Sequence, residues 1–125
     1  MQISLFKKNI LLVQKSKVRS LLYRDTLCLC GFEIMHISDI KSLDEHLSHS
    51  DIVMIDDDVA EENELFQHVK RIFLANTPVP IILVSNKRVP IYMQDMLYTV
   101  FAKSESVSNL AACIVQYSEN ALYGP

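Results

Sequence analysis

This chain of 125 residues contains one especially informative run, Asp51-Ile52-Val53-Met54-Ile55-Asp56-Asp57-Asp58. Four consecutive apolar residues stand in it without alternation, and three acids follow at once. An unbroken apolar run of this kind is typical of a strand buried on both faces, as in a parallel sheet covered by helices. The run therefore predicts a central strand that ends in a carboxylate.

Four further segments have the character of strands. Three are uncharged apolar runs and the fourth, which mixes Glu33 and His36 among apolar residues, suits an edge strand; they are Ile10–Val13, Ile81–Val84, Thr99–Ala102 and Phe32–Ile37. Together with the run at Ile52–Ile55 they predict a sheet of about five strands.

Helical patterns separate these strands. Ser16 is placed to cap a helix that runs to about Cys30 and ends at Gly31. Its predicted apolar stripe is Val18, Leu21, Leu22 and Leu29. The other predicted helices are Ser42–His49, a stripe of Leu65, Val69, Ile72 and Phe73, the segment Pro90–Leu97, and, behind a cap at Ser104, a stripe of Val107, Leu110, Ala111, Ile114 and Val115.

Strands that alternate with helices predict right-handed crossovers and a doubly wound parallel sheet. Five such units give the flavodoxin-like strand order 2-1-3-4-5, an α/β fold. The length fits a single domain over residues 1–125, and we expect a core over about 9–118 and a surface tail over 119–125.

The composition excludes several classes of protein. Half of the residues are apolar and the net charge is −3, which argues against a disordered chain and against direct binding of nucleic acid. The longest uncharged apolar run has four or five residues, far fewer than the roughly 20 that span a membrane. Cys28, Cys30 and Cys113 form no C-x-x-C pair, so we expect neither a disulfide framework nor a zinc site, and we expect a cytoplasmic location.

Chemistry in this fold is placed at the carboxyl ends of the strands. The residues expected there are Gln14 and Lys15 after the first strand, Asp56, Asp57 and Asp58 at the third, Ser85 at the fourth and Lys103 at the fifth. An acid, a hydroxyl and an amine would then converge in one pocket.

In these features the chain resembles the receiver domains of bacterial two-component response regulators, the CheY-like superfamily. The resemblance extends from about residue 9 to residue 117 and rests on five segments: Asn9–Val13, Cys30–Ile34, Asp51–Asp56, Pro80–Ser85 and Phe101–Lys103. It implies that Asp56 is at the phosphoacceptor position, that Ser85 is at the Ser/Thr switch position, and that Lys103 is the family's pocket lysine.

The sequence also departs from the family pattern. The two acids that hold Mg²⁺ in the family align with Gln14 and Lys15, and the positions of an aromatic switch and of a proline are taken by Val100 and Ser104. The stretch from Ser85 to Lys103 is a few residues shorter than usual, so the fourth helix should be short. These departures indicate an atypical, degenerate receiver.

We therefore expect no catalytic residue and no Mg²⁺ cofactor, since Mg²⁺ prefers carboxylate ligands and a lysine would repel it. Lys15 either pairs with Asp56 as a built-in cation or extends into water. The expected pocket consists of Asp56 with Gln14, Lys15, Asp58, Ser85 and Lys103.

The predicted function is signal transduction through protein contacts, and not enzymatic activity. One alternative is a receiver that is still phosphorylated on Asp56, with Asp58 helping to hold a metal. Another is a small flavodoxin-like enzyme or nucleotide binder, for which the loop after the first strand offers only Ser16.

A protein partner or a homodimer is expected on the face of the fourth helix, fifth strand and fifth helix. That face carries Tyr92, Met93, Met96, Tyr98 and Tyr117, residue types that are favoured at interfaces. The resemblance also allows for an output domain after Pro125.

Overall fold

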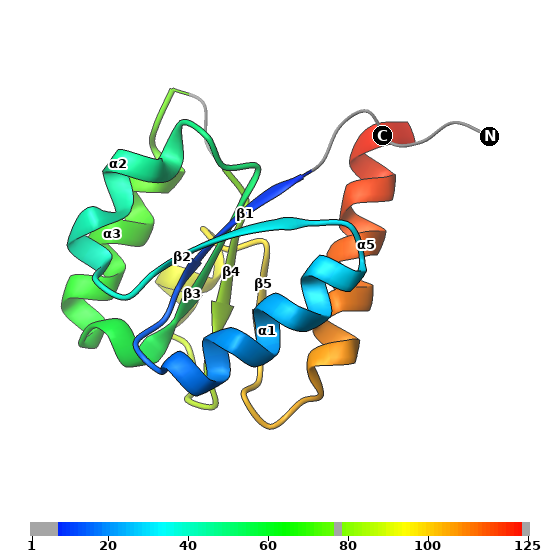
Figure 1. Ribbon diagram of the computed structural model, residues 1–125. Coiled ribbons are helices and arrows are strands. Elements are labelled where there is room, and N and C mark those ends of the chain that lie inside the picture. The colour runs from blue at the N-terminus through cyan, green and yellow to red at the C-terminus, as the bar shows by residue number, and fades with distance from the viewer. Residues whose placement is uncertain (1–7, 77–78, 124–125) are drawn as a thin grey trace.

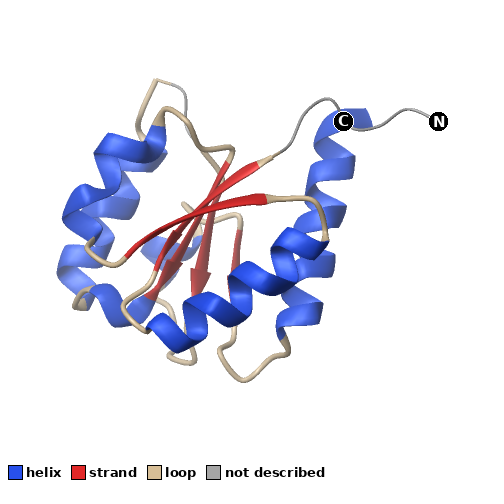
Figure 2. Cartoon of the chain, viewed as in Figure 1, coloured by secondary structure: helices blue, strands red, loops and turns tan. Residues whose placement is uncertain are grey.

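The computed structural model describes residues 8–76 and 79–123, and its centre is a parallel sheet with helices on both faces (Figures 1 and 2). The strands are β1 (Asn9–Val13), β2 (Glu33–Ile37), β3 (Ile52–Asp56), β4 (Ile81–Val84) and β5 (Thr99–Phe101). Their order is β2-β1-β3-β4-β5, and every neighbouring pair is parallel. The fold predicted from the alternating apolar runs is confirmed.

The helices lie in two layers. They are α1 (Lys17–Leu29), α2 (Leu43–Leu47), α3 (Glu62–Phe73), α4 (Ile91–Gln94) and α5 (Val107–Tyr123), with short 3₁₀ turns at Ile40–Ser42 and Asp57–Val59. In Figures 1 and 2, α1 and α5 cover one face of the sheet, while α2 and α3 cover the other. The short α4 contributes Met93 to the core on the α2 and α3 side.

The apolar runs are unbroken because both faces of each central strand are buried. In β3, Ile52 and Met54 pack toward α1 and α5, whereas Val53 and Ile55 pack toward α2 and α3. The register pairs Val13 of β1 with Ile55 of β3. The residues that follow these two positions, Gln14 and Asp56, therefore leave the sheet at the same edge.

Helix α1 is rotated relative to the prediction. Its buried residues are Ser20, Tyr23 and Leu27, while Val18 and Leu29 of the predicted stripe are 79% and 89% exposed. Leu21 and Leu22 also face solvent, so the whole predicted stripe lies on the outer surface of the helix. The helix has two apolar faces. The face with Tyr23 and Leu27 is the buried one, because these side chains pack in the core between the sheet and α5.

Several element boundaries also differ from those predicted. α2 and α4 are shorter than the predicted ranges Ser42–His49 and Pro90–Leu97, and the expectation that the fourth helix is short is confirmed. The 3₁₀ turn at Ile40–Ser42 precedes α2. Ser106, rather than Ser104, accepts the backbone N–H of Asn109 at the start of α5. Where a tail was expected from residue 119, the backbone stays helical to Tyr123, and residues 124–125 lie outside the described part. No helix in residues 8–76 and 79–123 has the length and apolar character needed to cross a membrane.

Candidate functional site

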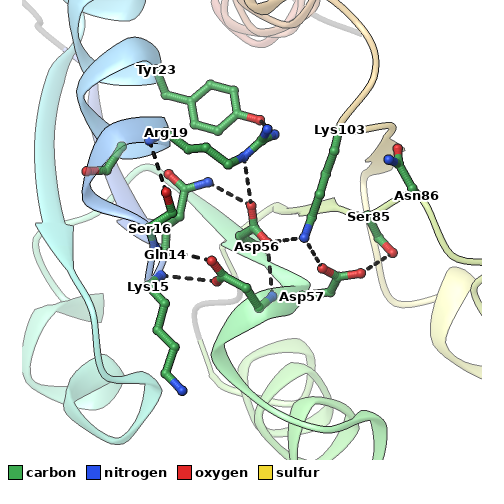
Figure 3. A network of polar contacts seen from close by, with 12 residues as sticks. Gln14, Lys15, Ser16, Arg19, Tyr23, Asp56, Asp57, Ser85, Asn86 and Lys103 are labelled. Carbon is green, nitrogen blue, oxygen red and sulfur yellow. Dashed lines mark hydrogen bonds and ion pairs between the residues drawn. The ribbon is translucent and has the colours of Figure 1, made fainter.

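Asp56 lies at the centre of a polar cluster at the carboxyl edge of the sheet (Figure 3). Its side chain is 0% exposed. Oδ1 accepts the backbone N–H of Asp58 at 2.9 Å and lies 2.8 Å from Nζ of Lys103. Oδ2 accepts Nε2–H of Gln14 at 2.7 Å. Donors that follow β1, β3 and β5 thus surround one buried carboxyl group, and a buried polar group needs such partners.

Asp57 connects this carboxylate to Ser85. Nζ of Lys103 bridges Asp56 and Asp57, and Oγ of Ser85 donates to Oδ2 of Asp57 at 2.6 Å. Ser85 Oγ in turn accepts the backbone N–H of Lys87 at 3.0 Å. The hydroxyl of Ser85 therefore both donates a hydrogen bond and accepts one. Asp57 was expected at this edge of the sheet but was not among the predicted pocket residues; its place directly after Asp56 was the available signal.

The protonation of this bridge follows from its contacts. Burial by itself would raise the pKa of Asp57, but the hydrogen bonds from Lys103 and Ser85 outweigh it and hold this pKa below its usual value. Burial would likewise lower the pKa of Lys103, yet its hydrogen bonds to Asp56 and Asp57 raise that pKa above the usual value. The bridge between Lys103 and Asp57 is therefore charged at neutral pH.

Asp58 has a structural role in the loops. Its carboxylate accepts the backbone N–H groups of Lys15 and Ser16, at 3.0 and 3.2 Å, and so ties the loop after β3 to the loop after β1. The side chain of Lys15 is exposed and points away from Asp56 (Figure 3). The built-in pair of Lys15 and Asp56 that the sequence left open is therefore not formed. The backbone of Lys15 faces Asp58, which directs its side chain to the opposite side.

A different cation, Arg19, which was not among the predicted site residues, approaches Asp56 from α1. Nε of Arg19 lies 3.7 Å from Oδ2 of Asp56, which is close enough for an ion pair but too far for a hydrogen bond. Its Nη2 donates to the hydroxyl of Tyr23 at 2.6 Å. Arg19 could have been found from its place three residues after the cap Ser16, because the first turn of this helix adjoins the carboxyl edge of the sheet.

The resemblance implies a Mg²⁺ ion held by carboxylates, and the residues here do not fit that group. Gln14 gives its amide N–H to Asp56, and its buried Oε1 has no hydrogen-bond partner among the described residues. Arg19 adds a positive charge beside the same carboxylate. Among residues 8–76 and 79–123, no three His, Cys, Asp or Glu side chains are grouped so that they could hold a metal.

The cavity next to this cluster is small. It adjoins Asp57 and Ser85 and has a volume of about 70 Å³. Small-molecule sites usually have about 300–1,000 Å³. A larger cavity of about 250 Å³ lies at the opposite ends of β1 and β2, beside His46 and His49. The cavity beside Asp57 and Ser85, lined by described residues, is therefore smaller than a flavin or nucleotide site usually is.

The five surface candidates are in different environments. Met93 is 1% exposed and belongs to the core, so its assignment to an interface is corrected: the single turn of α4 points it at the sheet. Met96 packs partly on the same core. Tyr92 is half exposed and donates to Glu62, while Tyr98 is half exposed and stacks edge-on against Tyr117, with 4.5 Å between ring centres.

Comparisons with known proteins identify the fold. No family model matches the sequence, and no curated protein matches it. Among solved structures, it is similar to the signal receiver domain of a putative LuxO repressor protein from Vibrio parahaemolyticus, with a TM-score of 0.81, 14% identity, and coverage of 94% of this chain and 95% of that one.

Two other solved structures have the same fold. An orphan response regulator of H. pylori has a TM-score of 0.74 and 19% identity, covering 87% of this chain and 94% of that one. The chemotaxis response regulator CheY4 of Vibrio cholerae has a TM-score of 0.75 and 16% identity, covering 89% and 98%. The chain therefore has the fold of response regulator receiver domains, and Asp56, Ser85 and Lys103 lie together at the edge where this fold places its chemistry.

Proposed function

We propose that this chain is an atypical receiver domain that acts in signal transduction by binding proteins, without Mg²⁺-dependent phosphorylation of Asp56. The observation that carries the proposal is the enclosure of Asp56. Its carboxylate is fully buried and takes hydrogen bonds from Gln14, Lys103 and the backbone of Asp58, with Arg19 close by.

Transfer of a phosphoryl group to a carboxylate depends on positioning and on cations that neutralise the transferred oxygens. A phosphodonor would have to reach an oxygen of Asp56 that already accepts a protein hydrogen bond. Ser85, at the switch position, would have to leave both Asp57 and the backbone of Lys87. These contacts favour one fixed state of the site.

Incubation with a small-molecule phosphodonor and Mg²⁺, followed by intact-mass measurement, tests this proposal. We expect no added phosphoryl group. The matched control is Asp56→Asn, which identifies transfer to any other residue. A phosphoryl group that appears on the unchanged chain and is lost in Asp56→Asn would establish the phosphorylated alternative in place of this proposal.

We place the partner site on the face formed by α4, β5 and α5. Ile91 and Tyr98 are exposed there, Val100 is partly exposed on the edge strand, and Tyr117 supports Tyr98 from α5. Aromatic side chains provide large contact areas at a low cost in conformational entropy. The outer surface of α1, with its exposed Leu21 and Leu22, is a second apolar surface that fits a protein-binding domain.

Light scattering tests the first surface for binding of a second copy. Val100→Glu puts a charge into its middle, and Ser38→Glu, at the exposed position directly after the opposite edge strand β2, is the control. We expect a concentration-dependent dimer that Val100→Glu weakens and Ser38→Glu does not. A strict monomer at all concentrations would exclude the homodimer and leave a different protein as the partner.

The proposal also places the protein in the cytoplasm and assigns it no enzymatic activity. Cys28 and Cys30 are exposed free thiols, which suits a reducing compartment. Non-reducing mass spectrometry of protein taken from cells would show disulfide-linked species if this placement were wrong.

A further inference from the structure

Helix α1 places one cationic side chain, that of Arg19, next to Asp56. Ser16 caps the helix, and its Oγ accepts the backbone N–H of Arg19 at 3.2 Å. This cap fixes the first turn against the carboxyl edge of the sheet. The side chain of Arg19 then extends toward Asp56, as Figure 3 shows, with Nε 3.7 Å from Oδ2.

Tyr23 holds the guanidinium in this place. The hydroxyl accepts Nη2–H of Arg19, and the guanidinium carbon lies 5.4 Å from the centre of the ring, within the range of a cation–π contact. Tyr23 itself is buried in the core cluster with Leu27. Arg19 therefore loses two contacts to a fixed aromatic side chain if it swings out into water.

Every carboxylate oxygen of the cluster already accepts a contact from a protein donor. Asp58 uses both of its oxygens on the backbone of the β1–α1 loop, and Asp57 uses both on Lys103 and Ser85. Both oxygens of Asp56 are also occupied. Two protein cations, Lys103 and Arg19, stand beside these carboxylates, whereas the ammonium of Lys15 is directed away (Figure 3).

We infer that Arg19 is the residue that sets the cation preference of this site: it is a resident counter-ion of Asp56, held by Tyr23, and it excludes a divalent metal. Lys15, the residue that the sequence alone points to, does not have this role. The inference rests on the proposed function, namely that the unchanged site works without Mg²⁺. It assigns a positioning role to Tyr23, which acts only through Arg19.

The experiment compares Mg²⁺ binding by calorimetry and by thermal melts in four proteins. These are the unchanged chain, Gln14→Asp with Lys15→Asp, the same pair with Arg19→Met, and the same pair with Arg24→Met. Arg24 is an exposed arginine of the same helix, so the last protein controls for the loss of one positive charge on α1.

The unchanged chain should show no response to Mg²⁺. The pair of new acids should bind weakly, and Arg19→Met should tighten binding by at least about tenfold, because a unit charge a few ångströms from a divalent ion is unfavourable even in a partly solvated site. Arg24→Met should leave the affinity of the pair unchanged within about twofold, because exposed charges at a distance are screened.

The outcomes separate the two proposals. If Arg19→Met fails to bind Mg²⁺ more tightly than the pair of acids alone, or if Arg24→Met tightens binding equally, the role of Arg19 is refuted while the proposed function stands. If the unchanged chain binds Mg²⁺ and acquires a phosphoryl group on Asp56, the proposed function is refuted. Should Arg19→Met not fold, Arg19→Gln removes the charge but keeps a donor for Tyr23, and the same comparison decides.

Discussion

Replacing Asp56 by Asn tests whether this carboxylate holds the ends of the strands together. Asn keeps the size of the side chain but removes its charge and turns one acceptor into an N–H donor. In one orientation the new NH₂ group faces Nζ of Lys103 and the backbone N–H of Asp58, which are both donors. In the other it faces Gln14, whose amide would have to turn so that Oε1 accepts the new N–H. The variant thus loses the ion pair with Lys103 and has to rearrange its buried hydrogen bonds.

The expected size of the effect follows from burial. Removing one member of a fully buried charge pair usually costs about 3–5 kcal/mol. Here Lys103 is 24% exposed and keeps Asp57, so the lower end of this range applies. We expect the free energy of unfolding to fall by about 3 kcal/mol, which for a domain of this size lowers Tm by about 10 °C.

Equilibrium unfolding in guanidinium chloride, with thermal melts alongside, measures this loss. The matched control is Asp25→Asn, the same chemical change on an exposed position of α1, which should stay within about 0.5 kcal/mol of the unchanged protein. A double-mutant cycle with Lys103→Met should show a coupling of about 1–2 kcal/mol between Asp56 and Lys103.

An Asp56→Asn protein that is as stable as Asp25→Asn, or more stable than the unchanged chain, would refute this reasoning. It would mean that the buried carboxylate is a source of strain at the site. A coupling near zero in the cycle would likewise show that the short distance between Asp56 and Lys103 has no net energetic value.

Three further outcomes follow from the same contacts. Ser85→Ala should raise the pKa of Asp57 and lower the free energy of unfolding by about 1 kcal/mol at neutral pH. A depressed pKa stabilises the fold only above the pKa of the unfolded state, so this loss should shrink as the pH falls below about 4, which urea unfolding across pH would measure. Lys15→Ala should change the unfolding free energy by less than about 0.5 kcal/mol, since its ammonium makes no contact with the acids, and a larger loss in denaturant titration would contradict Figure 3. Leu22→Ala should be nearly neutral in the same assay, whereas Leu27→Ala should cost about 2–5 kcal/mol, and equal losses would mean that α1 has the opposite rotation.

The sequence contained enough information to predict the sheet. The unbroken run Ile52–Ile55 is typical of a strand buried on both faces. Four such runs and one mixed edge strand, separated by helical periods, leave few topologies. Because chemistry in this fold lies at the carboxyl ends of the strands, the sequence also predicts that Asp56, Ser85 and Lys103 meet at one edge. Periodicity determines which residues share a strand face, and topology determines which strand ends meet.

The rotation of α1 and the identity of the second cation depended on tertiary structure. Both faces of α1 carry apolar residues, so local periodicity could not decide between the stripe of Leu21 and Leu22 and the face of Tyr23 and Leu27; contacts with the sheet and α5 decided it. That rotation also turns Arg19 toward Asp56. Whether a long cationic side chain reaches an acid depends on the position and rotation of its helix to within a few ångströms. These are determined only when all of the elements pack together.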